Sequence, residues 1–350
     1  MDNVKLQIVG DIMIESKQIN YIKDNSDYTD DNEFLFGKCF RYIKNYLKDN
    51  DYLIGNLETP ITNKLSSYPF FSANKEFLKA ISNLGFNMFI TSNNHCLDQG
   101  YKGFNQTLDN IDELNIDHIG TYRNIQEKKD NYPFIKTINN IKIGFLSYTY
   151  IPKSLNKEKR CVFGISGQFD KNAKEIINFY NKEQFDIDIK KLKSKQPDVI
   201  ITFMHWGPNA ELSFNYDKEQ QYDIAQYLIN NDVDVIVGGH PHFPQKTEWM
   251  YDKNNKKHLV IFSLGSFIST MHTVFINSGK ILNLNITKTY NNIDISFNEK
   301  LIFTSDNNMN NINNYTELHN IYVKKINYNK TNILTPNERQ KTIWLEKNLL

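Results

Sequence analysis

The sequence has little cysteine and no excess of charge of one sign. Its three cysteines, Cys39, Cys96 and Cys161, are odd in number and never spaced as C-x-x-C, which argues against a disulfide framework or a zinc knuckle. We interpret them as buried or incidental thiols. The 41 basic residues nearly balance the 40 acidic residues, so the total charge gives no general attraction to nucleic acid or to an anionic membrane. We therefore expect no nucleic-acid partner.

Long apolar runs are absent as well. No stretch approaches the ~18 apolar residues that a membrane-spanning helix requires. The chain opens with MDNVKLQIVGDIM, in which no basic segment precedes a long apolar run as it would in a secretory signal peptide. We expect no membrane span and a cytoplasmic location as the sequence is written, with the extracellular face as the alternative if a leader was removed. The sequence does not indicate an oligomeric state.

The sequence does contain a regular alternation of short apolar runs and amphipathic stretches. Strand-like runs are predicted at residues 4–11, 51–55, 86–92, 116–122, 141–150, 197–207, 233–242 and 259–267. Apolar residues at helical spacing predict helices at residues 32–50, 74–85, 103–115, 185–196 and 217–231. Strands and helices that alternate through short connections are typical of an α/β fold, with helices packed on a central sheet.

The pattern changes after Gly279. Two successive strand-like runs, 280–290 and 291–304, are typical of a hairpin. From Asp306 the sequence is rich in asparagine and patchy, with one helical stretch at 337–348. Because there is neither an internal repeat nor a linker rich in proline or serine, we predict one domain over residues 1–305 and a C-terminal extension over residues 306–350.

Five of the strand-like runs end in polar residues at the same relative place. These ends are Gly10-Asp11, Gly55-Asn56-Leu57-Glu58, Ser92-Asn93-Asn94-His95, His205-Trp206-Gly207 and Gly239-His240-Pro241-His242. Ligand sites of α/β sheets form where the carboxyl ends of strands converge. We therefore expect two carboxylates, an amide and up to four imidazoles around one crevice.

This set of donors suits divalent metal ions. Imidazole nitrogens bind Zn, Fe and Mn, and carboxylate and amide oxygens suit Mn and Fe as well. The set contains no cysteine, which disfavours a structural zinc site. It also has more donors than one tetrahedral ion needs. We therefore predict two neighbouring ions of Mn, Fe or Zn, an arrangement used in phosphoryl transfer because it stabilises the attacking and leaving oxygens together.

Each motif alone has a simpler structural explanation. Gly-Asp or Asn-Asn after a strand is usually a turn, and a histidine within an apolar strand is about as often a core residue. His240 and His242 form the strongest local motif, because one rigid turn carries two imidazoles. The ordered set is far more specific than any member. The histidines outside the clusters are interpreted as structural, with His272 alone kept as a candidate rim residue: His118, His258, His272 and His319.

The ordered blocks resemble a known family. "GDIM", "GNLETP", "SNNHCLDQG", "HWG", "GGHPH" and "FSLGSF" are similar, in order and spacing, to the CapA family, which is named for the synthesis of bacterial poly-γ-glutamate capsules. The resemblance covers residues 4–270 and implies the calcineurin-like metallophosphoesterase fold. In that fold two β-sheets form a sandwich flanked by helices, with a metal site at the sheet edge.

The resemblance implies a set of metal ligands. Glu58 would take the bridging acidic position, with Asn56 as the alternative at that position or as a supporting residue. The implied ligands are Asp11, Glu58, Asn94, His205, His240 and His242.

The resemblance also implies catalytic roles. His95 corresponds to the histidine that protonates the leaving group, and His205 would stabilise charge on the reacting group as well as bind metal. Asp98 either orients His95 or caps the following helix, and we favour the cap together with a supporting role.

Two differences are from the wider metallophosphoesterase superfamily and are shared by CapA relatives, and two are from the CapA pattern itself. Met13 stands where the wider superfamily has the histidine of Asp-x-His, so one imidazole ligand is missing. Asn56 stands where that superfamily has an acid. Glu211 lies later than the glutamate that relatives carry after "HWG", and Ser266 replaces an asparagine.

Two functions follow from these observations. We expect metal-dependent hydrolysis of a phosphoester or a related bond in an anionic small molecule or polymer, by a metal-activated water, with His95 as general acid. Trp206, Phe243 and Tyr148 are candidates for an aromatic rim, and are equally expected as core residues. The alternative is a non-catalytic, metal-binding accessory protein in the synthesis or export of a capsule polymer. A nuclease is disfavoured, because no basic stripe with interleaved aromatic residues is present.

Overall fold

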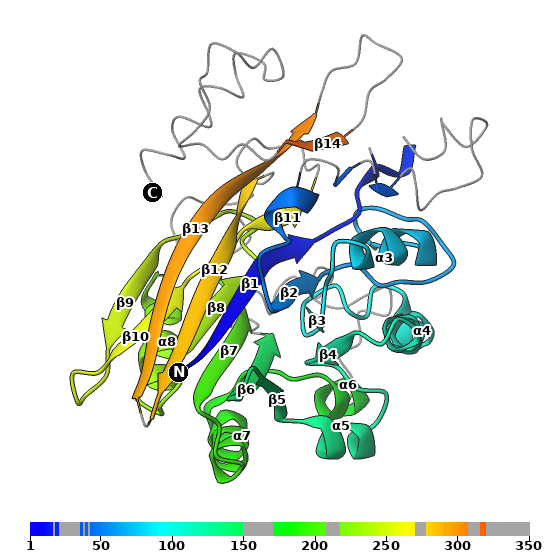
Figure 1. The fold of residues 1–350 in the computed structure, drawn as a ribbon. Coiled ribbons are helices and arrows are strands. Elements are labelled where there is room, and N and C mark those ends of the chain that lie inside the picture. The colour runs from blue at the N-terminus through cyan, green and yellow to red at the C-terminus, as the bar shows by residue number, and fades with distance from the viewer. Residues whose placement is uncertain are drawn as a thin grey trace, which may run out of the picture.

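The computed structural model describes residues 1–16, 18–20, 36–37, 39–40, 43–149, 171–207, 218–269, 278–290, 292–306 and 316–319. These residues form two β-sheets that face each other, with helices on the outer side of each sheet (Figure 1). The α/β sandwich predicted from the sequence is therefore confirmed.

The first sheet is centred on the N-terminal strand. Its members are β1 (Asp2–Ile12), β2 (Tyr52–Leu57), β3 (Met88–Ile90), β4 (Asp117–Ile119), β11 (Ser266–Ile268), β12 (Ser278–Thr289), β13 (Asn292–Asp306) and β14 (Thr316–His319). The order is β14-β13-β12-β1-β2-β3-β4, and β11 also pairs with β1. Strands β1 to β4 are parallel, whereas β12 to β14 add antiparallel to the other side of β1.

The second sheet has a parallel centre and antiparallel edges. Its order along the sheet is β5 (Phe134–Ile138), β6 (Ile141–Thr149), β7 (Val199–His205), β8 (Val235–Gly239), β10 (Lys257–Ile261) and β9 (Thr247–Tyr251). The strands from β6 to β10 in this order are parallel, while β5 and β9 run antiparallel to their neighbours. Parallel strands share one carboxyl edge, and each sheet therefore brings several strand ends together.

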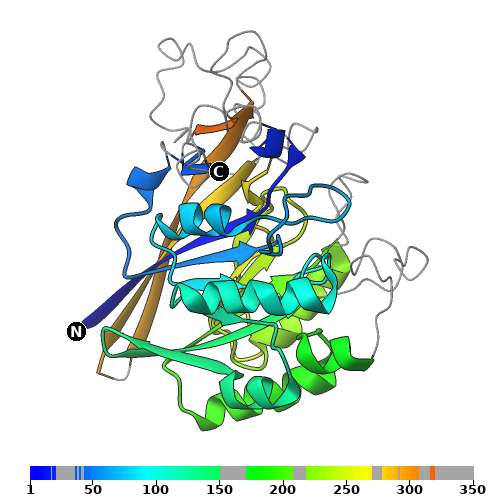
Figure 2. The same ribbon diagram turned by 90° about the vertical axis from the view of Figure 1, so that its right-hand side faces the viewer.

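Helices cover the outer faces of both sheets. They are α3 (Lys75–Ser82), α4 (Gly100–Glu113), α5 (Ile125–Asn131), α6 (Lys171–Ile176), α7 (Lys182–Ser194) and α8 (Lys218–Ile229), with a 3-10 turn η2 (Lys44–Tyr46). Figure 2 shows α3 and α4 lying across the strands of the first sheet. Asn74, Asn124 and Asn181 cap α3, α5 and α7, because each side chain accepts a backbone N–H of the first helical turn.

The core between the sheets is built by alternation along the strands. Val4, Leu6 and Ile8 of β1 point into it, as do the alternate residues of β6 and β7 that begin at Ile141 and Val199. Successive side chains of a strand point to opposite faces of the sheet, so the intervening residues pack under the helices instead. Both faces of these central strands are buried, which explains their nearly continuous apolar sequences.

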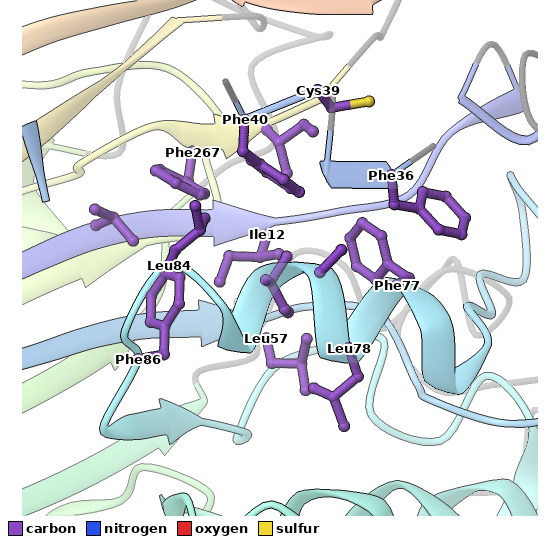
Figure 3. Close-up of a cluster of buried hydrophobic side chains, with 14 of the residues drawn as sticks. Ile12, Phe36, Cys39, Phe40, Leu57, Phe77, Leu78, Leu84, Phe86 and Phe267 are labelled. Atoms are coloured by element: carbon purple, nitrogen blue, oxygen red, sulfur yellow. The ribbon is translucent and has the colours of Figure 1, made fainter. Parts of the chain in front are cut away.

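A second core lies between the first sheet and α3. Figure 3 shows Leu78 of α3 beside Leu57 of β2 and Phe77 of α3 beside Phe36, in the cluster that also contains Ile12 at the carboxyl end of β1. Phe267 of β11 belongs to the same cluster, where its ring stacks on Phe40 with 6.1 Å between centroids. Full burial of each such side chain stabilises the fold by roughly 1.5–3 kcal/mol. The ends of β1 and β2 are thus held on a packed base.

Most predicted elements occur where the sequence places them. The run 259–267 is an exception, because the prediction of one strand there is wrong: β10 ends at Ile261 in the second sheet, and β11 starts at Ser266 in the first. Gly265, with φ +69°, lies in the crossing between the two. The sequence pattern also missed α5, α6, β5, β9 and β14. The predicted helix at 32–50 lies mostly outside the described residues.

The chain after Gly279 forms the expected hairpin of β12 and β13. β14 pairs with the far end of β13, and the division at residue 306 remains a prediction. The helix predicted at 337–348 lies outside the described residues. Among the described helices, none combines the length and the apolar character needed to cross a membrane.

Candidate metal centre

The five polar strand ends meet at one place between the two sheets. Asp11 is paired in register with Asn56 on β2, and His205 with Gly239 on β8. The sheets are joined here by the backbone N–H of His240, which donates to Oδ2 of Asp11 at 3.2 Å. The strand ends therefore converge in the structure, as the sequence predicts.

One group of donors consists of Asp11, Glu58 and His242. Nδ1 of His242 lies 3.0 Å from Oδ2 of Asp11, and its Nε2 lies 3.8 Å from Oε1 of Glu58. One ligand atom from each of the three residues lies within 4.8 Å of the others, a spacing at which they could hold a metal ion. All three side chains are buried.

A second group consists of Glu58, His205 and His240, and it meets the same 4.8 Å spacing. Nε2 of His205 lies 3.3 Å from Oε1 of Glu58 and 3.1 Å from Nδ1 of His240. Asn94 adds an oxygen, since its Oδ1 lies 2.6 Å from Nε2 of His205. Glu58 thus belongs to both groups.

The buried atoms of this centre are poorly satisfied by the protein. Oε1 of Glu58 and Nδ1 of His242 have no hydrogen-bond partner among the described residues, although each has an oppositely charged or chargeable neighbour within 4 Å. A buried polar atom without a partner is costly. Carboxylate and imidazole atoms that converge without hydrogen-bonding one another are what a divalent cation would satisfy, so these residues fit a metal ion.

The pKa values reflect the crowding of charge. Burial tends to raise the pKa of Asp11, but the imidazoles of His242 and His205 hold it below its usual value. Burial and the neighbouring Asp11 raise the pKa of Glu58 well above its usual value. The carboxylates in turn raise the pKa of His242 to about 9, although burial alone would lower it.

The other two imidazoles shift in the opposite direction. Burial lowers the pKa of His205 to about 3, and burial together with the neighbouring imidazoles lowers that of His240 well below its usual value. Both rings are therefore neutral at physiological pH, which is the form that ligates metal. The centre places two neutral imidazoles on one side of Glu58 and a protonated one on the other.

Asn56 presents its amide nitrogen to the centre. Its Nδ2 donates to Oδ1 of Asp11 at 2.7 Å and to Oε2 of Glu58 at 3.3 Å. Its oxygen faces Asn93, whose Nδ2 donates to it at 3.2 Å and to the carbonyl of Leu57 at 2.9 Å. The amide therefore orients the two carboxylates, and its oxygen does not face the position of a bridging ligand. Asn93 is adjacent to Asn94 in the same motif, but it is not among the site residues predicted from the sequence.

His95 forms a separate dyad with Asp98. Its Nδ1 lies 2.7 Å from Oδ2 of Asp98, which also accepts the backbone N–H of Phe71 at 2.8 Å. Burial works against protonation, yet the Asp98 carboxylate raises the pKa of His95. The predicted role of Asp98 as a helix cap is wrong, because α4 begins after Gln99 and its N-cap has no side-chain hydrogen bond. The carboxylate is committed to His95 and Phe71 instead.

Glycines allow the strand ends to approach so closely. A Cβ added to Gly239 would lie 2.8 Å from Oδ1 of Asp11, and one added to Gly10 would lie 1.8 Å from the carbonyl oxygen of Gly265. That carbonyl accepts the backbone N–H of Asp11 at 2.9 Å. Gly239 is thus required where the two sheets meet, and Gly10 where β1 meets the chain that leads into β11.

Several remaining expectations can be placed. Trp206, Phe243 and Tyr148 are buried in the core, so the aromatic-rim alternative is wrong for all three. Met13 is also buried, and Ser266 donates its hydroxyl to the carbonyl of His242 at 3.4 Å.

The histidines outside the centre have structural surroundings or lie at the edge of the first sheet. His118 pairs with Asp112, His258 is buried against the carbonyl of Val233, and His319 lies on β14. Free thiols are present at Cys39 and Cys96. Cys161, Glu211 and His272 lie outside the described residues.

Comparison with known proteins identifies related chains. A solved calcineurin-like phosphoesterase, YfkN from Bacillus subtilis, is similar over 86% of this chain and 90% of that one, with a TM-score of 0.46 and 13% identity. The capsule biosynthesis protein CapA of Bacillus anthracis is 25% identical over 76% of this chain. The PGA biosynthesis protein CapA of Bacillus subtilis (strain 168) is 24% identical over 65% of it. The chain spans 60% and 56% of the length of these two relatives.

The family assignment rests on sequence. The family model of the bacterial capsule synthesis protein PGA_cap matches residues 5–271. This range contains each of the polar strand ends. It also contains the two places where the chain passes from one sheet to the other, between β4 and β5 and between β10 and β11. The protein belongs to the PGA_cap family of bacterial capsule synthesis proteins.

Proposed function

We propose that this protein is a metal-dependent hydrolase that cleaves a phosphoester or a related bond in an anionic substrate. One observation carries the proposal: Glu58 belongs to both of the donor groups at the converging strand ends. A carboxylate shared by two sets of imidazoles suits two neighbouring ions. Such a pair stabilises the attacking and leaving oxygens of a displacement together.

The two groups assign the ligands. Asp11, Glu58 and His242 would hold one ion, and Glu58, His205 and His240 the other. Asn94 would add an oxygen beside His205. This mixture of imidazole and carboxylate suits Mn, Fe or Zn.

The chemistry divides between the ions and the protein. When bound, the ions would supply an activated water and stabilise charge on the reacting group. His95 is the proton donor toward the leaving oxygen. Asp98 occupies its Nδ1 at 2.7 Å, which leaves Nε2 as the atom that delivers the proton, and Asp98 then stabilises the ring in the required orientation. His205 suits ligation and not proton donation, because its ring is held neutral by its lowered pKa.

The substrate class is suggested by the relatives. Two are named for capsule or PGA biosynthesis, and we propose an anionic polymer of this kind, poly-γ-glutamate or its precursor, as the substrate. A small anionic phosphoester is the other candidate within the same class.

A non-catalytic accessory role in capsule polymer synthesis or export is the second candidate function. It is favoured by Met13, a buried thioether in the position where metallophosphoesterases carry a histidine ligand. The orientation of Asn56 favours it as well, because its amide nitrogen faces Asp11 and Glu58 and it therefore offers no oxygen ligand to the centre. A site altered in this way could bind metal for structure alone.

Metal analysis paired with a turnover assay tests the proposal. The purified chain is expected to retain a divalent metal and to hydrolyse phosphomonoesters or phosphodiesters with added Mn²⁺. Turnover should disappear in His240→Ala and fall by ~10²- to 10⁴-fold in His95→Ala, while His95→Ala should keep its metal. Bound metal without turnover on a broad panel would favour the accessory role. A chain that retains no metal, and in which His240→Ala changes nothing, would contradict the metal site itself.

A further inference from the structure

A buried lysine contacts the end of the loop that carries His240 and His242, from the hairpin that follows this loop in the chain. Lys280 of β12 is fully buried, and its ammonium lies 3.0 Å from Oε2 of Glu299 on β13. It also donates to the backbone carbonyl of Gln245 at 3.0 Å and lies 3.4 Å from Oγ1 of Thr247. An ammonium has three donors, and all three are satisfied here, which offsets the cost of burying the charge.

The carbonyl of Gln245 ends the histidine loop, which we define as residues 240–245. At the start of this loop, the N–H of His240 donates to Oδ2 of Asp11. At its end, the N–H of Gln245 donates to the carbonyl of Ser263 at 3.0 Å, and its carbonyl accepts from Lys280. The loop is therefore held at both ends, and at its far end the contact comes from the side-chain ammonium of Lys280.

Two residues of the histidine loop have backbone conformations that the surrounding contacts must stabilise. His240 has φ +95° and His242 has φ +55°, both in the left-handed region that is unfavourable for residues with a Cβ. Two such residues in a short loop persist only where the surroundings determine the conformation. The same backbone conformation directs both imidazoles toward Glu58.

The contact is not explained by the hairpin alone. Thr247 already donates to the other oxygen of Glu299 at 2.5 Å, and β12 and β13 pair through twelve residues on each strand. A lysine that only joined the two strands would not need the carbonyl of Gln245. Lys280 and Glu299 also lie beyond residues 5–271, the range that the family model matches. The contact with the carbonyl of Gln245 is therefore made by a residue outside that range.

We propose that Lys280 is a positioning residue which, together with Glu299, keeps the histidine loop in the conformation that presents His240 and His242 to a metal ion. The inference rests on the proposed function for its consequence in metal binding, and on the contacts alone for its effect on the loop.

Hydrogen exchange of the metal-free, full-length chain tests the hold directly. Lys280→Met/Glu299→Leu removes both charges, because removal of one partner would leave an unpaired buried charge. Lys288→Met is the matched control, since Lys288 lies on the same strand and pairs with Asp198 at 2.7 Å, away from the loop. The backbone amides of residues 238–246 should exchange faster in the double variant alone, with β7 still protected. Equal exchange in the double variant and the control would overturn the proposal.

Two further measurements keep the test decisive. If the double variant does not fold, Glu299→Gln replaces it, with a smaller increase in loop exchange expected and no increase contradicting the proposal. In titrations with Mn²⁺, the double variant should bind ~10–100-fold more weakly, as found for residues that support metal ligands, while Lys288→Met should match the wild type. Equal affinity in the double variant and the wild type would overturn the inference. A wild type that binds no Mn²⁺ would contradict the proposed function, and the exchange result would still decide the role of Lys280.

Discussion

The acidic residues at the two ends of the parallel strands behave in opposite ways. At the amino ends, three partly exposed acids each have a lysine within 2.8 Å: Asp117 with Lys136, Asp198 with Lys288, and Asp234 with Lys256. At the carboxyl ends, Asp11 and Glu58 have side chains that are 0% exposed. Among the described residues, no lysine or arginine forms an ion pair with either of them.

This difference distinguishes acids that are paired within the protein from acids that are placed to bind a ligand. The acids at the amino ends also accept backbone N–H groups, as Asp198 and Asp234 do from Lys142 and Ile200, so their neighbours fully account for them. The acids at the carboxyl ends have only imidazoles and an amide beside them. Buried carboxylates are normally paired or coordinate a metal. This contrast supports the proposal that Asp11 and Glu58 bind a divalent cation.

The largest expected effect is at the shared carboxylate. Glu58→Gln should abolish measurable Mn²⁺ binding, a greater loss than the ~10–100-fold typical of supporting residues, because both donor groups lose their common member. Turnover should disappear with it. Asp117→Asn, at the opposite strand end, is the control and should leave Mn²⁺ affinity unchanged in calorimetric titration. Retention of wild-type affinity in Glu58→Gln would break the comparison.

The next effect separates metal binding from proton transfer. His95→Ala should lower kcat by ~10²- to 10⁴-fold, the usual contribution of a positioned general acid, while Mn²⁺ affinity stays near that of the wild type. Asp98→Asn should lower kcat less and shift the pH dependence of turnover, since Asp98 raises the pKa of His95. Loss of metal in His95→Ala would instead place His95 among the ligands.

A pH series tests whether the raised pKa of His242 contributes to the stability of the fold. In the metal-free protein the pKa of His242 is raised to about 9 from an ordinary 6.5. A raised pKa in the folded state stabilises the fold below the unfolded pKa, and that stability is lost as the pH rises through the folded pKa. The advantage of wild type over His242→Gln in urea unfolding with chelator should therefore shrink between pH 6.5 and 9. An advantage that stays constant over this range would contradict the shift.

The smallest effect is expected at the amino ends. Lys136 and Asp117 form a partly exposed ion pair, and such pairs contribute ~0.2–1 kcal/mol. Lys136→Met should change the free energy of unfolding within that range and leave both metal affinity and turnover unaltered. A change in either of the last two would show that the two strand ends are coupled.

The sequence was sufficient to predict the place of the centre, because strand ends can be read from apolar runs. Glycine and polar residues follow the runs that end at Asp11, Glu58 and His205, and parallel pairing then brings them together. The sequence could not predict the orientation of the Asn56 amide, which depends on Asn93. It could not assign Asp98 either. This residue lies three positions after His95 and also just before α4, so its position in the sequence suits both an ion pair with His95 and a helix cap.

Other features needed the tertiary structure. The run 259–267 is mostly apolar, yet its two halves join different sheets, because Gly265 turns the chain across the sandwich. The aromatic residues near the motifs are equally suited to a rim or a core by composition, and only packing places Trp206 against Phe262. The contact from Lys280 to Gln245 joins residues far apart in sequence and has no local pattern.

The most direct test of the account is the position of bound metal. Crystals of the full-length chain grown with Mn²⁺, measured at the manganese absorption edge, would locate the ions by anomalous scattering. The account predicts two peaks on either side of the Glu58 carboxylate, one beside Asp11 and His242 and the other beside His205 and His240. A fully occupied manganese site elsewhere, or none between these residues, would contradict it.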